Sequence, residues 1–202
     1  MVYVDHCDTN ELKARWASDP HVNADALPVD AVWGEATLRQ AIMAVDAVPV
    51  PPAGLAYVLA SHVIEHVPDL VTWLREVKDV LSPTGVLRLA VPDKRYTFDL
   101  LRRTTLLPEV AEAYIRRRRA PSASRVLDFA MHMAEVDCGR AWRGVLNTDK
   151  LVRGYTDAQA LGLAEDAERN GAYHDVHCWV FTPSSFVDLM TSMARCGLLE
   201  MS

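Results

Sequence analysis

The sequence predicts an α/β protein in which a parallel sheet with flanking helices is followed by a helical insertion. In the first half, short apolar runs alternate with segments whose apolar residues recur at helical spacing. This alternation is typical of right-handed βαβ units. From about Lys94 to Ala172 the helical periodicity continues with few strand signals. The chain has 202 residues, of which 50% are apolar, and this suits one globular domain with a real core.

The expected strands are short apolar runs, each followed by a polar residue or a turn signal. They lie at Val2–Val4, Pro28–Trp33, Leu55–Ala60 and Val86–Val91. The third follows a proline-rich stretch, and the fourth follows a turn expected at Ser82–Gly85. Because these two runs are continuously apolar, we expect them to be buried strands.

Helices are expected between the strands and through most of the second half. Asp69 can cap one of them, whose apolar positions run from Leu70 to Leu81. The other helices are expected at 10–17, 35–45, 109–119, 124–135, 157–170 and 184–196.

The expected organisation is a single domain, 1–202, without internal repeats. It would consist of an α/β part (1–93), a helical insertion (94–172) and a return to the core with the last helix (173–202). Ligands of parallel sheets bind at the carboxyl ends of the strands. The polar residues that follow the expected strands would therefore gather on one rim.

Composition and charge argue against several classes of protein. No run of 18 or more apolar residues exists, so we expect no membrane span. The four cysteines are scattered without a C-x-x-C pair and no secretory signal is visible, which indicates a cytoplasmic protein. The formal net charge of −6 argues against nucleic acid as a partner.

One local charge imbalance is basic, with seven arginines within residues 102–125. The first interpretation is a solvated helix face. The second is a patch for an anionic substrate, an anionic partner or a membrane surface.

The segment His62-Val63-Ile64-Glu65-His66 has the spacing H-x-x-E-H, which one class of zinc hydrolases uses on a long helix. Here the segment directly follows an expected strand, and Pro68 would interrupt any helix through His66. A third ligand at a fixed spacing is not evident, although Glu135, Asp137, His174 or His177 could supply one. A zinc-dependent hydrolase is therefore the weakest hypothesis, and we predict no metal site.

The stretch "YVLASHVIEHVPDLVTWLREVKDVLSPTGVLRLAVPD" resembles the fourth to fifth strands of class I S-adenosylmethionine-dependent methyltransferases. It is most similar to the methyltransferase type 11 group, which has an apolar strand, a turn reading L-E-H-V-x-D, and a helix ending in a P-G turn before the next strand. The segments "VPDKRYTFD" and "HCWVFTP" look like a bacterial subset of that group. The resemblance implies a Rossmann-like sheet with the helical insertion after the family's fifth strand.

The resemblance also implies residues that hold the cofactor, S-adenosylmethionine. Asp5 matches the acid that accepts hydrogen bonds from the ribose hydroxyls, a role that suits an acceptor-only carboxylate. Trp33 lies in the segment that matches the adenine site. An acid there would accept from the adenine amino group, and the sequence leaves Asp30 and Glu35 as alternatives.

The turn after the third expected strand matches the segment beside the transferable methyl group. Ser61 and His62 would flank the methionine part of the cofactor, and His66 or His62 would act as the base. A neutral histidine can take a proton from a hydroxyl near pH 7. The implied reaction is methyl transfer to an O or N atom of a small molecule, with an anionic acceptor as one option.

The chain also departs from the family pattern. The family places a strand and a Gly-rich loop ahead of the segment that matches Val2–Val4, and no G-x-G occurs in this sequence. The expectation is a sheet that is incomplete at both ends, with an open strand edge that favours self-association. A catalytically inactive remnant or a partner-binding module is therefore the alternative to an active methyltransferase.

Overall fold

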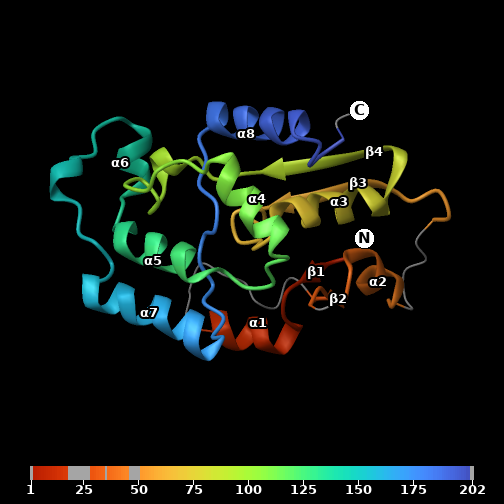
Figure 1. The fold of residues 1–202 in the computed structure, drawn as a ribbon, viewed down its shortest axis with the longest axis horizontal. Coiled ribbons are helices and arrows are strands. Elements are labelled where there is room, and N and C mark those ends of the chain that lie inside the picture. The colour runs from red at the N-terminus through yellow and green to blue at the C-terminus, as the bar shows by residue number, and fades with distance from the viewer. Residues whose placement is uncertain (1, 18–27, 35, 46–50, 201–202) are drawn as a thin grey trace. The chain divides into compact units, whose positions relative to one another are not determined.

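The computed structural model describes residues 2–17, 28–34, 36–45 and 51–200 (Figure 1). The elements of the first part are β1 (Val4–Asp5), α1 (Thr9–Trp16), β2 (Ala31–Val32), α2 (Leu38–Met43), β3 (Leu55–Ser61), α3 (Leu70–Val80) and β4 (Leu81–Ala90). They are followed by the 3-10 helix η1 (Lys94–Tyr96), α4 (Leu107–Ile115), α5 (Ala123–His132), α6 (Cys138–Trp142), the 3-10 helix η2 (Thr148–Lys150), α7 (Asp157–Asn170) and α8 (Pro183–Arg195).

The described strands form two sheets, each of two parallel strands, β1 with β2 and β3 with β4. In the first pair Val4 lies opposite Ala31, and Asp5 lies opposite Val32. At the carboxyl end of the second pair, the amide of His62 donates to the carbonyl of Ala90 over 3.0 Å. The predicted α/β class with parallel pairing is confirmed, but the described strands form two separate pairs and not one continuous sheet.

The turn expected at Ser82–Gly85 is wrong, because β4 begins at Leu81 directly after α3. Gly85 explains the difference. A Cβ built on it would lie 2.7 Å from the carbonyl oxygen of Leu55, so only glycine allows this close approach of β4 to the start of β3. The Ser-Pro-Thr-Gly stretch therefore continues the strand.

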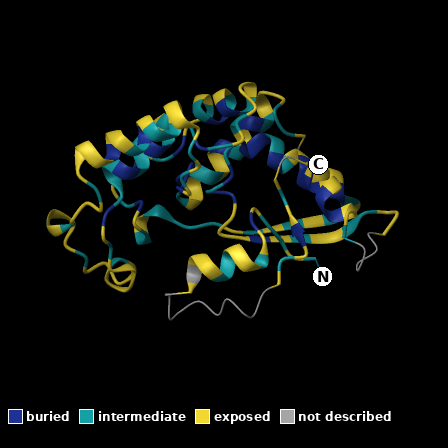
Figure 2. Ribbon diagram, turned by 90° about the horizontal axis from the view of Figure 1, so that it is seen from below, coloured by how far each residue is buried: buried dark blue, intermediate teal, exposed yellow. Residues whose placement is uncertain are grey.

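The prediction that β3 and β4 are buried is also wrong for the structure described. Only Ala60 of β3 is buried, and Figure 2 shows both strands mostly in the colours of intermediate and exposed residues. Among their large apolar side chains, Tyr57, Leu59 and Val86 are each at least half exposed. The described chain covers the faces of these strands only in part.

The chain divides into two compact units. The first comprises Met1–Val58 and Arg75–Arg88, and the second comprises Leu59–Leu74 and Leu89–Ser202. The turn after β3 belongs to the second unit, together with the helical region.

One part of the core of the second unit lies between two helices that pack through small side chains. Helices α5 and α7 lie side by side (Figure 1). Val126 and Ala130 of α5 are fully buried, as is Ala160 of α7. The bounds predicted for α7 are confirmed, since Thr156 caps its first turn and Gly171, with φ of +66°, ends it.

An extended segment, residues 176–181, runs buried through the second unit. Its Phe181 forms a parallel bridge with Asp93, and the amide of Val180 donates to Thr105 Oγ1 over 2.8 Å. This segment brings the histidine of "HCWVFTP" into the interior. In the part of the chain that the structure describes, no helix has both the length and the apolar character needed to cross a membrane.

Candidate functional site

The turn that follows β3 carries the two histidines of the H-x-x-E-H segment. Ser61 ends β3 and is exposed, and His62 adopts a positive φ of 53°, which is uncommon for a residue other than glycine. The next helix, α3, begins only at Leu70, and Asp69 caps it by accepting from the Thr72 amide over 3.0 Å. The two histidines therefore lie on a turn, and the long helix of the zinc hydrolases is not formed here.

His66 pairs with a carboxylate from a distant part of the sequence. Its Nδ1 lies 2.8 Å from Oδ1 of Asp175, and the His66 side chain is about one-third exposed. Burial alone would lower the pKa of His66, but the hydrogen bond to Asp175 and the neighbouring acids outweigh it and raise the pKa above its ordinary value.

His177 is held by a buried network of charges. Its Nδ1 donates to Oδ2 of Asp99 over 2.5 Å, and Oδ1 of Asp99 accepts from Arg102 over 2.7 Å. Burial would raise the pKa of Asp99, but His177 and Arg102 outweigh it, so the pKa of this carboxyl is lowered. Asp128 also accepts from Arg102 over 2.8 Å and completes the pairing of a guanidinium that is fully buried.

Glu65 contrasts with this network. Its side chain is fully buried, and neither carboxylate oxygen has a hydrogen-bond partner. The nearest cationic candidate is Nδ1 of His62, 3.4 Å from Oε1, on a side chain that is 64% exposed. The backbone holds Glu65 in place, because its carbonyl accepts from the amides of Cys178 and Trp179 over 2.6 and 3.2 Å.

Glu65, His66 and His177 converge at one point of the second unit. Each can offer one ligand atom, and the three atoms lie within 4.8 Å of one another. The rings of His66 and His177 stand nearly perpendicular, with centroids 4.6 Å apart. We call these three residues the His/Glu cluster. It places two imidazoles and a carboxylate where they could share a proton or a cation.

In the first unit, the structure shows local roles for the residues predicted to hold the cofactor. Asp5 ends β1, and its Oδ1 accepts from the His6 amide over 2.7 Å. Burial would raise the pKa of Asp5, but the hydrogen bonds of His6 outweigh it and lower the pKa. Trp33 directly follows β2, and its indole donates to the carboxylate of Glu76 over 3.1 Å.

Of the two acids proposed for adenine, the structure describes Asp30. Asp30 precedes β2, and its carboxylate accepts from the Tyr3 amide over 2.9 Å. This places Asp30 at the amino end of the β1–β2 pair, whereas Asp5 lies at the carboxyl end. Glu35 lies outside the described residues.

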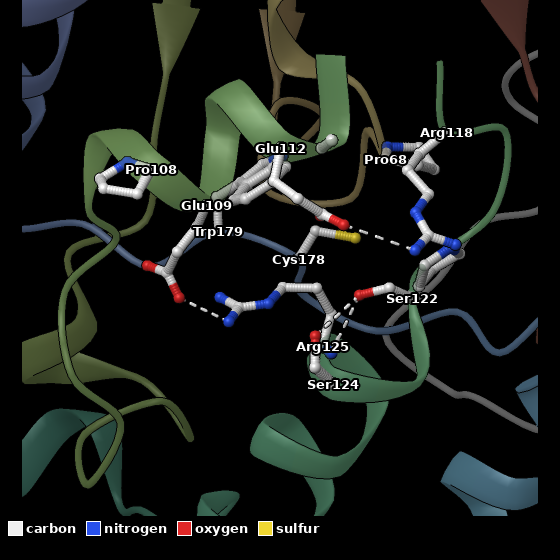
Figure 3. A pocket seen from close by; sticks show the side chains of 12 residues that line it. Pro68, Pro108, Glu109, Glu112, Arg118, Ser122, Ser124, Arg125, Cys178 and Trp179 are labelled. Carbon is white, nitrogen blue, oxygen red and sulfur yellow. Dashed lines mark hydrogen bonds and ion pairs between the residues drawn. The ribbon is translucent and has the colours of Figure 1, made fainter. Parts of the chain in front are cut away.

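A pocket of about 250 Å³ lies beside α4 and the start of α5 in the second unit (Figure 3). The charged side chains that line the pocket have both signs and form ion pairs. Arg125 pairs with Glu109, and Arg118 lies 3.7 Å from Glu112. Five of the seven clustered arginines pair with carboxylates: Arg102, Arg103, Arg116, Arg118 and Arg125. Because these arginines already have carboxylate partners, the arginine cluster gives less support to an anionic methyl acceptor.

The sequence interpretation missed several residues of the second unit. Asp175 and Asp99 orient the two histidines, Arg102 neutralises Asp99, and Glu65 is the buried acid. His177 was only one of four alternatives for a third ligand. The only sequence signal for these residues was the spacing H-D-x-H at 174–177, directly before an apolar run. Histidines and acids that are buried with such a run need hydrogen-bond partners.

Comparison with known proteins adds no information to this geometry. No protein-family model matches the chain, and neither a curated protein nor a solved structure matches it.

Proposed function

We propose that this chain is a Rossmann-like S-adenosylmethionine-dependent methyltransferase that transfers a methyl group to an O or N atom of a small molecule. The observation that carries the proposal is the pairing of His66 with Asp175, on the turn that follows the carboxyl end of a parallel strand. Such strand ends are where α/β sheets bind their ligands. The sequence resemblance of this turn to the methyltransferases supports the same location.

The chain's own residues suit the parts of this reaction. S-adenosylmethionine supplies the activated methyl group when bound. Asp175 holds the His66 ring through Nδ1 and leaves Nε2 to accept a proton from the O or N atom of an acceptor. Most of the acceleration would come from alignment of the acceptor with the methyl group.

The residues proposed for cofactor binding fit that role to different degrees. Asp5 presents a half-buried carboxylate at the carboxyl end of a parallel strand, as a ribose-binding acid requires. Trp33 offers an indole directly after β2 for contact with adenine. Asp30 fits poorly, since it lies at the other end of the strands. Ser61, the last residue of β3, and His62, which follows it, are both exposed.

Calorimetric titration of the purified chain with S-adenosylmethionine and S-adenosylhomocysteine tests the proposal. We expect binding of both, weakened about 10- to 100-fold by Asp5→Asn, because a charge-assisted hydrogen bond contributes roughly 1.5–3 kcal/mol. Asp30→Asn is the matched control and should leave the affinity unchanged. Absence of binding at millimolar cofactor would refute the proposal for this chain.

Turnover separates an enzyme from an inactive remnant. The measurement is release of S-adenosylhomocysteine in the presence of a panel of phenols, alcohols and amines. We expect His66→Asn to lower the rate about 10²- to 10⁴-fold, the usual contribution of a general base, with cofactor affinity preserved. Cofactor binding without turnover on any acceptor would favour the remnant.

A further inference from the structure

We propose that Glu65, His66 and His177 form a binding site for a divalent transition-metal ion of the zinc class. The inference goes beyond the proposed function, because it stands on the side chains of the second unit alone. It would hold equally for a chain that transfers no methyl group. It also revises the expectation from sequence that the chain has no metal site.

The first observation is the state of Glu65. A fully buried carboxylate with no hydrogen-bond partner is costly, because an ion taken out of water needs a compensating charge or donors. The guanidinium of Arg102 is fully buried too, yet it is neutralised by Asp99 and Asp128. A cation bound between Glu65 and the two imidazoles would give Glu65 the same compensation.

The second observation is the support behind each histidine. His66 uses Nδ1 for Asp175 and His177 uses Nδ1 for Asp99, at 2.8 and 2.5 Å. Metal-binding histidines characteristically donate their other ring N–H to a carboxylate, which fixes the tautomer and makes the free nitrogen a better ligand. In this cluster, both rings thus keep Nε2 as the atom that an ion would use.

The third observation is that the backbone fixes the two ligand-bearing segments against each other. The Glu65 carbonyl accepts from the amides of Cys178 and Trp179, and the Trp179 indole donates to the Val67 carbonyl over 2.6 Å. The ligands come from residues 65–66 and 177, so these bonds clamp both segments on either side of the cluster. A metal site needs such rigid support to hold its ligands in place.

The donor set indicates the class of ion. Two imidazoles and one carboxylate suit Zn²⁺ or a neighbouring divalent transition metal, whereas Mg²⁺ and Ca²⁺ prefer oxygen ligands. Three protein ligands leave a coordination position open, which is the arrangement of catalytic sites. If the chain is also a methyltransferase, the ion would lower the pKa of an acceptor hydroxyl bound at that position. His66 would then act as a ligand and not as a free base.

A second group of potential ligands, Asp5, His6 and Cys7, provides a control. These residues are adjacent in sequence, the His6 side chain is 40% exposed, and Asp5 already accepts from His6. No buried polar group is left without a partner there among the described residues. This group therefore carries no proposal, but an experiment has to distinguish it from the His/Glu cluster.

The test is a zinc titration of the full chain after chelation, by competition with a chromogenic chelator and without S-adenosylmethionine. We expect one equivalent of Zn²⁺ to bind and to raise the unfolding temperature, because the ion binds only the folded state. Glu65→Gln and His177→Gln should weaken binding more than 100-fold. Asp175→Asn should weaken it by about 10- to 100-fold, as removal of a supporting carboxylate does elsewhere.

Two control variants make the result specific. His174→Gln removes a histidine that pairs with Asp166 outside the cluster, and it should leave zinc affinity unchanged. His6→Gln should also leave it unchanged, and the Co²⁺-loaded protein should show no thiolate-to-cobalt charge-transfer band. Loss of binding in His6→Gln, or a thiolate band, would overturn the proposal by placing the ion at Asp5–Cys7.

The remaining outcomes are equally decisive. The proposal fails if the chelated wild-type chain does not compete for zinc, or if Glu65→Gln binds zinc as tightly as wild type. Glu65→Gln also has a readout that does not need the metal. The apo variant should unfold at a higher temperature than the apo wild type, because it removes an uncompensated buried charge. Zinc binding without cofactor binding would overturn the methyltransferase proposal while leaving the metal site intact.

Discussion

Asp99 and His177 lie 78 residues apart in the sequence, yet Oδ2 of Asp99 is 2.5 Å from Nδ1 of His177 in the interior of the second unit. Arg102 pairs with the other oxygen of the same carboxylate. One acid thus orients a histidine and neutralises a buried guanidinium. Asp99 therefore stabilises the interior of the second unit and also orients a histidine of the His/Glu cluster.

The first prediction concerns the loss of this carboxylate. Asp99→Asn should destabilise the protein by about 3 kcal/mol, because it leaves Arg102 with only Asp128 as a charged partner in a buried setting. Urea unfolding measures the change. Asp166→Asn, which alters the half-exposed pair with His174, is the control and should have a much smaller effect. Equal losses in the two variants would contradict this assignment.

The second prediction concerns the interface of α5 and α7. Ala160 is fully buried where these helices pack, whereas Leu161, the next residue, is 52% exposed. Ala160→Leu should cost about 1–3 kcal/mol, since extra methylenes do not fit a packed core. Leu161→Ala should be close to neutral, within about 0.5 kcal/mol. If the two variants unfold at the same urea concentration, the packing described for α7 is wrong.

The contrast between α7 and the cluster shows how far sequence interpretation reaches. The bounds of α7 were predicted correctly from helical periodicity, which is a local signal, and its cap at Thr156 and terminal Gly171 are local features too. Asp69 was recognised as a cap for the same reason. The turn at Ser82–Gly85 was predicted wrongly, because the approach of Gly85 to Leu55 is a tertiary fact that residue type does not reveal.

The residues of the candidate site also differ in whether local sequence patterns could identify them. His62 and His66 could be selected because they follow an apolar run in a motif. Their partners could not, because Asp175 meets His66 across 109 residues and no local rule links the two. The burial of Glu65 likewise depends on the segment 176–181 that passes beside it. Local patterns therefore indicate where the site lies in the sequence, whereas the partners and burial of its side chains depend on long-range contacts.

The third prediction concerns pH and the ion pair of Asp93 with Arg95. The hydrogen bond from Arg95 is the main cause that lowers the pKa of Asp93 below its ordinary value of 3.8. Because the folded-state pKa is lowered, the pair stabilises the protein above the unfolded-state pKa, and this is lost as the pH falls through the folded-state pKa. Arg95→Gln should thus be less stable than wild type at neutral pH and equally stable in strong acid.

Urea unfolding at a series of pH values tests the third prediction. In an Asp93→Asn background the effect of Arg95→Gln on stability should be the same at every pH, since the titrating carboxylate is absent and the contact of Arg95 with the Tyr96 ring does not depend on it. A stability difference between Arg95→Gln and wild type that stays constant into strong acid would contradict the pairing.

The fourth prediction concerns the reactivity of the cysteines. Cys178 is 1% exposed, and burial raises the pKa of its thiol to about 12, whereas Cys138 and Cys196 are exposed. Cys7 is also buried, and burial and Asp5 raise its pKa. Because the thiolate is the reactive form, a chromogenic disulfide reagent at pH 8 should modify two thiols quickly in the native protein and all four after unfolding. Mass spectrometry identifies the sites. Early modification of Cys178 would show that the segment carrying His177 opens readily, contrary to the clamped arrangement of Glu65 with Cys178 and Trp179.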